Sequence, residues 1–541
     1  MRIVASTHQK TARLEPKIDL SLQVLTNTEA YGACRASALV MRLNSAIHPV
    51  CQWPQGCYIQ DVPFLGRSQD MSILKVIFIF LEVLLLFNLL IFVHELGHFL
   101  AARWRGLKID RFAIWFGKPI WKTKINGVEY ALGTIPAGGY VSLPQMASME
   151  AIEGKGESSG QSLPPISALD KIIVAFAGPL FSFLLALAFA VVVMIVGRPV
   201  SEAETTTTIG YVEKDSPAEK AGLRPGDRIL EVDGRRVTKF AGMGSSVTWR
   251  IVRSEGEHVP IKVERDGKEL RLVAEPAKEE TKFWQRKGLR QLKIAPAVSS
   301  IVAEVMTNSP AAVAGLQARD QVLDVNGKKL NQFGELGEYV DEHPGERLTL
   351  NVLRNGKSFE VALTPQKPIS PPNEKPRLGI IWDANGKTTL AYPGAIEQVT
   401  ASVGAMLETF GALFARHSDI KAQHLGGAVK IMDVYYRLFS SEQGWRLAIW
   451  FSVLMNVNLA LLNMLPIPVL DGGHILLAIV EGIRRRPISM RILSTIQTGC
   501  AVLLIGFMVY IAFYDVQDLP WKRSKEKPIE LKFAPKASEQ H

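Results

Sequence analysis

The chain has 541 residues, too many for one ordinary hydrophobic core, so several domains are expected. Hydrophobic residues make up 47% of it and gather in long apolar runs between strongly polar stretches, which is typical of a membrane protein with a soluble insert. The net charge is +10, but no basic cluster is interleaved with aromatic residues, so we expect contact with membrane lipid and no nucleic acid partner.

The first part of the chain, residues 1–70, has neither the periodicity of a fold nor the short apolar core of a signal peptide. At Met71 the sequence changes abruptly to an apolar run. Two interpretations stay open: translation starts at or near Met71, or residues 1–70 are a real and mostly disordered extension.

Four apolar runs are long enough to cross a bilayer, which takes about 20 residues. They extend from Leu74 to about Leu100, from Ile172 to Val196, from about Leu447 to Leu465, and from Ile492 to Phe513. Basic residues after the first and third runs place both of these connections in the cytoplasm by the positive-inside rule, and the segment from Arg198 to about Arg446 outside. The basic tail from Lys522 onward would then lie outside, which argues mildly against this topology.

Between the first two spans, the alternating sequence from Phe116 to Leu143 surrounds an Asn126-Gly127 pair, which predicts a β-hairpin. The hairpin follows the first span closely, so we expect it at the membrane edge. Backbone is tolerated there only where it is paired or lines a cavity. An edge strand at this place could pair with a substrate segment that has lost its helix.

The segment between the second and third spans contains an internal repeat. DSPAEKAGLRPGDRILEVDGRRV begins at Asp215, and NSPAAVAGLQARDQVLDVNGKKL begins at Asn308. Ser-Pro-Ala favours a capped helix start, and the Gly-containing turns flank a short strand. The pattern resembles PDZ domains of bacterial proteases, predicted here over residues 204–290 and 291–385. Such domains bind extended peptides, including C-termini, by strand addition, but a PDZ-shaped spacer without ligand is the alternative.

The central motif, His94-Glu95-Leu96-Gly97-His98, closes the first span. Histidines four residues apart lie on one helix face and can reach one zinc ion, while Glu95 can reach a water bound to that ion. Zinc lowers the pKa of such a water to about 7, and the glutamate then serves as catalytic base. Ionisable groups in an apolar span are expensive unless they are functional, which favours this interpretation over simple helix packing.

A catalytic zinc site needs a third protein ligand. The best candidate is Asp471 in NMLPIPVLDGG, because the prolines prevent a regular helix and the glycines permit a tight turn on the same side of the membrane as His94. We consider His474 a weaker, competing ligand.

Together, HELGH on the first span and N-x-x-P-x-P-x-L-D-G-G after the third resemble the site-2 protease family. The tandem PDZ insert and the FGKPIW…GGYV segment resemble its bacterial regulator-of-sigma-E branch. The resemblance implies a polytopic α-helical inner-membrane protein with about four transmembrane helices, a membrane-associated β-hairpin and two periplasmic PDZ domains. It also implies regulated intramembrane proteolysis of single-span membrane proteins, such as a trimmed anti-sigma factor.

The resemblance further assigns roles to individual residues. It assigns zinc binding to His94, His98 and Asp471, and the general base to Glu95. It assigns substrate handling to Asn463, Pro466, Pro468, Gly138, Gly139 and Tyr140. One departure is Ser182, where the family often has asparagine; the shorter side chain puts a local contact in doubt.

We expect the protease part to be split in two, with the first half at residues 71–200, including the hairpin at 112–143, and the second half at 446–515. The uncertain extension at 1–70 precedes the first half. The two PDZ domains and an amphipathic connector at 386–445 lie between the halves, and a tail at 516–541 follows the second half. Two other functions remain as alternatives: a catalytically idle scaffold that presents PDZ domains, and a metal transporter. Within the enzyme hypothesis, the PDZ domains either bind new C-termini or act as a size filter.

Overall fold

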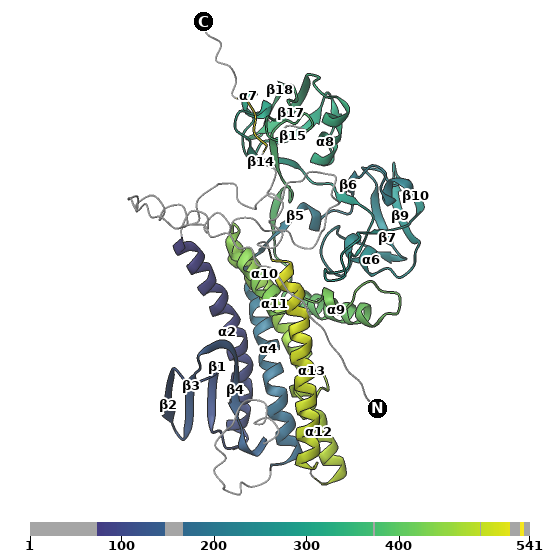
Figure 1. Cartoon of the computed structure of the whole chain (residues 1–541). Helices are drawn as coiled ribbons and strands as arrows, with labels where there is room; N and C mark the ends of the chain where they lie inside the picture. Colours follow the sequence, from purple (N-terminus) through teal and green to yellow (C-terminus); the bar gives the residue numbers. More distant parts are fainter. Residues whose placement is uncertain (1–72, 147–165, 372–373, 487, 520–530, 535–541) are drawn as a thin grey trace, which may run out of the picture. The chain divides into compact units, whose positions relative to one another are not determined.

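The computed structural model describes residues 73–146, 166–371, 374–486, 488–519 and 531–534 (Figure 1). All of them belong to one compact unit. The two interpretations of residues 1–70, the start at Met71 and most of the expected tail concern residues outside these ranges.

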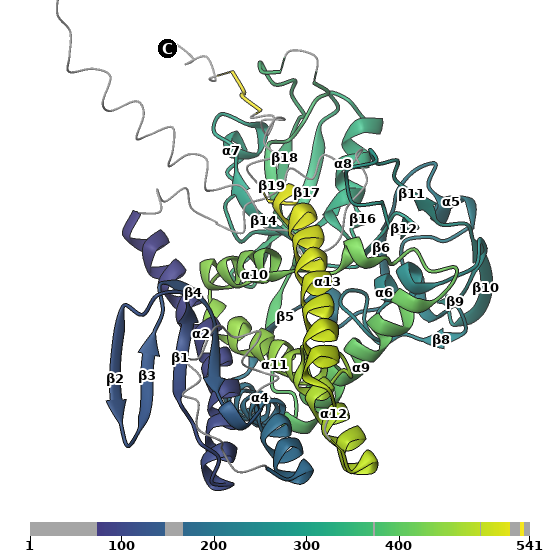
Figure 2. The same cartoon turned by 60° about the horizontal axis from the view of Figure 1, so that its bottom comes forward.

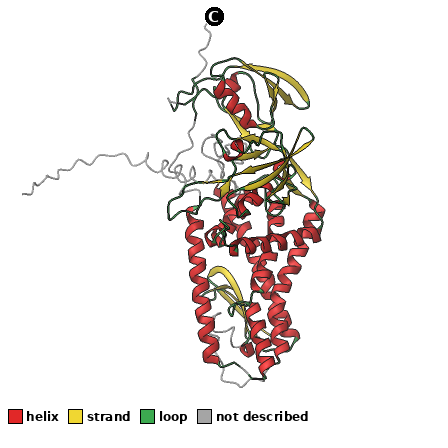
Figure 3. Ribbon diagram, turned by 90° about the vertical axis from the view of Figure 1, so that its right-hand side faces the viewer, coloured by secondary structure: helices red, strands yellow, loops and turns green. Residues whose placement is uncertain are grey.

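Within the described part of the chain, four helices are long and apolar enough to cross a membrane. They are α2 (Ile73–Trp104), α4 (Ala168–Val196), α11 (Gly444–Asn463) and α13 (Met490–Gln517). Each coincides with one predicted apolar run, so the prediction of four apolar helices of membrane-spanning length is confirmed. Helix α4 packs against α2, α11 and the shorter α12 (Asp471–Arg484), and the helices are seen side by side in Figure 3. This packing lets residues from opposite ends of the chain meet.

A four-stranded sheet follows α2 in the sequence and packs beside it (Figure 2). Its strands, in the order β2-β3-β1-β4, are β2 (Trp121–Ile125), β3 (Val128–Leu132), β1 (Arg111–Phe116) and β4 (Ile135–Ser142). The predicted hairpin is its β2–β3 pair, joined at Asn126 and Gly127, whose φ angles of 51° and 85° are those of a tight hairpin turn. Strand β4 is an edge strand, and it packs against α2.

The repeat forms two modules with separate hydrophobic cores, and their elements follow the same order except that the first module has two additional short strands, β11 (Ala277–Lys278) and β12 (Arg290–Gln291). The first contains β6 (Ile209–Val212), α5 (Pro217–Lys220), β7 (Arg228–Val232), β8 (Arg235–Arg236), α6 (Val247–Arg253), β9 (Val259–Arg265), β10 (Lys268–Ala274), β11, β12 and β13 (Ile294–Pro296). The second contains β14 (Ser300–Val305), α7 (Pro310–Val313), β15 (Gln321–Val325), β16 (Lys328–Lys329), α8 (Phe333–Glu342), β17 (Leu348–Arg354), β18 (Lys357–Leu363) and β19 (Ile380–Asp383). Since β13 pairs with β6, the first module continues past residue 290.

Both modules use the same buried ion pair. Asp227 accepts hydrogen bonds from Nε and Nη2 of Arg265 at 2.6 and 2.7 Å. Asp320 accepts the corresponding bonds from Arg354 at the same two distances. Each aspartate is 1% exposed or less, and each arginine also donates to the carbonyl of a glycine that follows the short capped helix. The two modules therefore share this aspartate–arginine ion pair as well as a similar hydrophobic core.

The connector between the modules and the third span is mostly helical. It contains β20 (Thr388–Ala391), which pairs with β5 (Arg198–Ser201), and then α9 (Ala395–Phe414) and α10 (Ala428–Ser440). Helix α9 packs on α4 and α11, and α10 packs on α2, α11 and α13. The connector thus contacts all four candidate spans.

Candidate metal centre

Three side chains from two helices converge on one point. His94 and His98 lie one turn apart on α2, and Asp471 is the first residue of α12. One ligand atom of each lies within 4.8 Å of the others. The Nε2 atoms of the histidines are 3.3 Å apart and lie 3.2 and 3.4 Å from the two carboxylate oxygens of Asp471.

Second contacts orient both imidazole rings. Nδ1 of His98 lies 2.8 Å from the carbonyl oxygen of Val174, which can only accept, so this nitrogen carries the proton. Nδ1 of His94 lies 3.0 Å from Oγ of Ser182. The sequence left the contribution of Ser182 in doubt, but here the hydroxyl is within reach. These bonds direct the Nε2 lone pairs to the common point, as is usual for metal-binding histidines.

The chemistry of the cluster fits a divalent cation. His94, His98 and Asp471 are 6%, 2% and 7% exposed. Asp471 Oδ2 is buried and accepts no hydrogen bond from the described residues. Lone pairs that converge in a buried site repel one another unless a cation lies among them, and two imidazoles with a carboxylate are ligands that zinc accepts. His474 is also buried, one turn further along α12, but it is not part of this cluster.

The local backbone at Asp471 differs from the predicted Asp-Gly-Gly turn. The chain leaves the helix after Asn463, but a new helix begins at Asp471 and includes both glycines. A Cβ atom at Gly472 would overlap the carbonyl group of Met464, and one at Gly473 would overlap that of Ile467. The glycines are therefore required for close packing of the irregular segment against α12, and the prediction of a turn was wrong.

Two other glycines bring α2 and α4 together. A Cβ at Gly97 would overlap the carbonyl oxygen of Ala177, and a Cβ at Gly178 would overlap the ring of His98. Gly178 was not predicted from the sequence as a residue that shapes the site. Its signal was a glycine within an apolar run, which often marks close approach of another backbone.

Glu95 lies between the metal cluster and the sheet. A Cβ at Gly139 would lie 3.1 Å from Cγ of Glu95, so this glycine lets the edge strand β4 approach the carboxylate side chain. Gly138 has a φ of 73° and lies against the ring of Phe116. Tyr140 stacks on Phe116, with centroids 6.3 Å apart, and its hydroxyl accepts a hydrogen bond from Arg111. Of these three predicted residues, Gly139 is the one next to Glu95.

The predicted residues before Asp471 also differ in their distance from the cluster. Nδ2 of Asn463 lies 3.3 Å from Nε2 of His94. Pro466 is exposed, and Pro468 is half-buried with its carbonyl 3.4 Å from Nε2 of Gln497 on α13. Asn463 is thus at the metal cluster, while the prolines shape the segment that leads to Asp471.

Comparisons with known proteins agree with this chemistry. The model of peptidase family M50 matches residues 82–507. A putative zinc metalloprotease of Pasteurella multocida is 30% identical over 465 residues, which cover 80% of this chain and 98% of that protein. One of Neisseria meningitidis is 29% identical over 453 residues, covering 79% and 96%. The regulator of sigma-E protease of Escherichia coli is 28% identical over 461 residues, covering 80% and 97%.

Proposed function

Because the chain belongs to peptidase family M50 and is a zinc metalloprotease of the membrane, we propose that it hydrolyses peptide bonds of single-span membrane proteins within the bilayer. The observation that carries the proposal is the convergence of His94, His98 and Asp471 beside Glu95, with both histidines and Glu95 on a helix that is apolar enough to cross a membrane.

In the proposed mechanism, His94, His98 and Asp471 hold the zinc ion. When bound, zinc supplies Lewis-acid activation of water and of the scissile carbonyl. Glu95 accepts the proton of the attacking water and delivers it to the amine that leaves. Val174 and Ser182 keep the two imidazoles in the tautomer that presents Nε2. The buried position of the cluster keeps bulk water away from these groups.

We further propose that β4 receives the substrate. A helix must unwind before a protease can cut it, and the exposed backbone then needs hydrogen-bond partners inside the membrane. Strand β4 is an edge strand next to Glu95, so it can pair with an extended substrate segment. Asn463, at the other side of the cluster, is placed to bind substrate backbone.

The two modules are proposed to be PDZ domains on the periplasmic side of the inner membrane, above an active site near the cytoplasmic side. Their repeat and shared element order support this assignment. Since relatives are named regulators of sigma-E protease, a trimmed anti-sigma factor is the proposed class of substrate. We favour a size filter that excludes uncut outer domains over binding of new C-termini. If a chain without residues 209–365 still spares uncut substrate, the filter is wrong.

Glu95→Gln tests the enzyme function. This variant should retain zinc but lose turnover of a reporter span in detergent, because an amide cannot accept the proton. Glu82→Gln makes the same change earlier on α2 and should leave turnover unchanged. His94→Ala and Asp471→Ala should lose zinc, which metal analysis reads directly. Cleavage by a Glu95→Gln protein would overturn the assignment of the base, whereas an unaltered chain that binds zinc without any turnover would support the idle-scaffold alternative.

A further inference from the structure

An exposed aromatic pair stands out in the first module, between β11 and β12. Phe283 is 91% exposed and Trp284 is 43% exposed, and their rings meet edge to face with centroids 4.7 Å apart. Leaving two large aromatic side chains in water is unfavourable, because removing their apolar surface from water is stabilising. A pair of this kind usually marks a surface that contacts something else.

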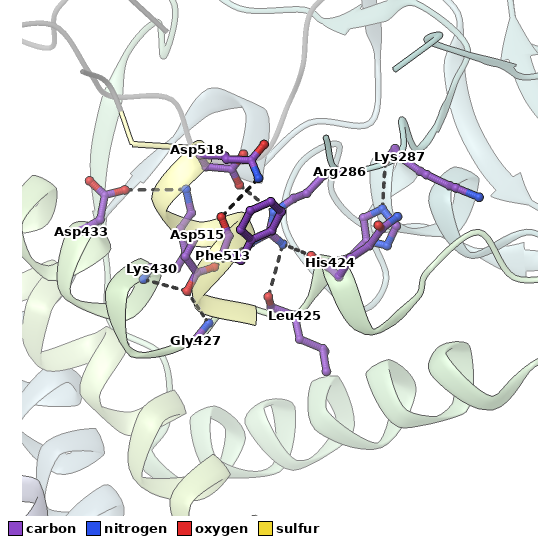
Figure 4. Close-up of polar contacts among 12 residues, drawn as sticks. Arg286, Lys287, His424, Leu425, Gly427, Lys430, Asp433, Phe513, Asp515 and Asp518 are labelled. Atoms are coloured by element: carbon purple, nitrogen blue, oxygen red, sulfur yellow. Dashed lines mark hydrogen bonds and ion pairs between the residues drawn. The ribbon is translucent and has the colours of Figure 1, made fainter. Parts of the chain in front are cut away.

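The segment that carries the pair is fastened to the end of the last span. Arg286 forms ion pairs with Asp515 at 2.6 Å and with Asp518 at 2.7 Å (Figure 4). Its Nη1 also donates to the carbonyl oxygens of Gln423 and Leu425 in the connector. The guanidinium group therefore joins the first module, the connector and α13.

The receiving aspartate is itself fixed. Asp515 is fully buried, and its second oxygen accepts hydrogen bonds from the backbone nitrogens of Gly427 at 2.8 Å and Lys430 at 3.2 Å. It thus caps the start of α10, for which Gly427 offers no side chain. Nearby, Nε2 of His424 lies 2.9 Å from the carbonyl oxygen of Lys287. These contacts hold the segment that carries Phe283 and Trp284 beside the C-terminal end of α13.

The C-terminal end of α13 is expected at the membrane interface. Helix α13 has 28 residues, or ~42 Å of helix, whereas the hydrocarbon core is about 30 Å thick. The helix is therefore longer than the core, and we place its C-terminal turns, which carry Asp515, in the headgroup region because a carboxylate is costly in hydrocarbon. Tyr510 and Phe513 are 43% and 54% exposed on these turns, as expected of an interfacial aromatic belt. Phe283 is three residues from Arg286, so their Cα atoms are at most ~11 Å apart.

We infer that Phe283 and Trp284 insert into the lipid headgroup region and anchor the first module to the membrane surface. Charges of both signs flank the pair: Glu279, Glu280 and Lys282 precede it and Lys287 follows it. Since these four charges balance, we expect burial of the rings, and not attraction to anionic lipid, to drive the contact. The anchor continues the aromatic belt of α13 onto a module that has no span of its own. It depends on α13 crossing the membrane, not on the proposed protease activity.

Photo-crosslinking of the full chain tests the anchor. p-Benzoylphenylalanine is placed at position 283, and the protein is reconstituted in vesicles of phosphatidylethanolamine and phosphatidylglycerol. Mass spectrometry should detect lipid adducts at position 283, as at Leu503 on the exposed face of α13. The same probe at Val313, 55% exposed on the second module, should give none. Adducts at 283 no more frequent than at 313, or adducts with protein, overturn the anchor.

A second variant tests whether the ion pairs of Arg286 hold the aromatic pair at the membrane surface. Arg286→Met removes the ion pairs with Asp515 and Asp518 but keeps a long side chain. In this background, lipid adducts at position 283 should fall several-fold, while those at 503 stay unchanged. Vesicles of phosphatidylethanolamine with and without phosphatidylglycerol should give adducts at 283 in similar yield. Adducts that require phosphatidylglycerol would overturn the claim that ring burial drives the contact.

Discussion

Oγ of Ser182 on α4 lies 3.0 Å from Nδ1 of His94 on α2. This contact fixes the ring of one proposed ligand from a different span, and Ser182 is fully buried. Ser182→Ala should therefore weaken zinc binding by ~10–100-fold, the usual effect of removing a residue that orients a metal ligand. Competition with a zinc chelator of known affinity, on the purified full chain in detergent, measures the change.

A matched variant distinguishes orientation from packing. Ser182→Asn keeps a hydrogen-bonding group at the same position and should retain tighter zinc binding than Ser182→Ala. If alanine and asparagine variants bind zinc equally well, the hydroxyl does not orient His94.

Gly178 lies against the other proposed histidine ligand. A methyl group at this position would overlap the imidazole of His98, whose Nδ1 is already held by Val174. Gly178→Ala should displace the ring, and we expect at least a tenfold loss of zinc affinity together with loss of turnover. Gly499→Ala, in α13, meets no atom within 4 Å and should bind zinc normally. Metal analysis of both purified variants makes the comparison.

The spans and the metal cluster were largely predictable from the sequence. An apolar run of sufficient length has few alternatives to a membrane helix, and the spacing of His94 and His98 needs only helix geometry. Asp471 could be predicted as the third ligand only by an argument about membrane topology, and its position beside both histidines agrees with that prediction.

Other features depended on contacts that a linear pattern does not contain. The helix that begins at Asp471 was read as a turn, because glycine more often signals a turn than close packing. The hairpin was predicted from its local turn, whereas the parallel pairing of β1 with β3 joins strands that are not adjacent in sequence. The contact of Ser182 with His94 depends on how α4 is rotated against α2, which the sequence does not specify.

The aspartate–arginine ion pair found in both modules is expected to stabilise each module separately. Asp320→Asn leaves Arg354 beside a neutral amide, and loss of this pair should lower the free energy of unfolding of the second module. Asp227→Asn should have the same effect on the first module through Arg265. Urea titration of the full chain, with limited proteolysis and peptide mapping, follows each module separately. If either variant lowered the stability of both modules equally, the two hydrophobic cores would not be independent.

The last prediction concerns Asn88, a polar residue within the first span. Nε1 of Trp115 donates a hydrogen bond to Oδ1 of Asn88, and Asn88 Nδ2 donates to the carbonyl oxygen of Leu84 at 2.7 Å. Trp115 has a φ of 69°, unusual for a bulky residue, and lies where the β1–β4 register shifts. The hydrogen bond thus ties the irregular point of β1 to α2, two turns before Glu95.

Because β1 is the strand that pairs with β4, this tie fixes the edge strand beside Glu95. Asn88→Leu keeps the side-chain volume but loses the bond, so turnover of a reporter span should fall by ~10- to 100-fold, as expected for a small displacement of a substrate-positioning element. Zinc content should not change, since neither residue touches the cluster. Trp115→Phe removes the same bond from the other partner and should reproduce the loss. Full turnover in both variants would mean that the sheet keeps its place without Asn88.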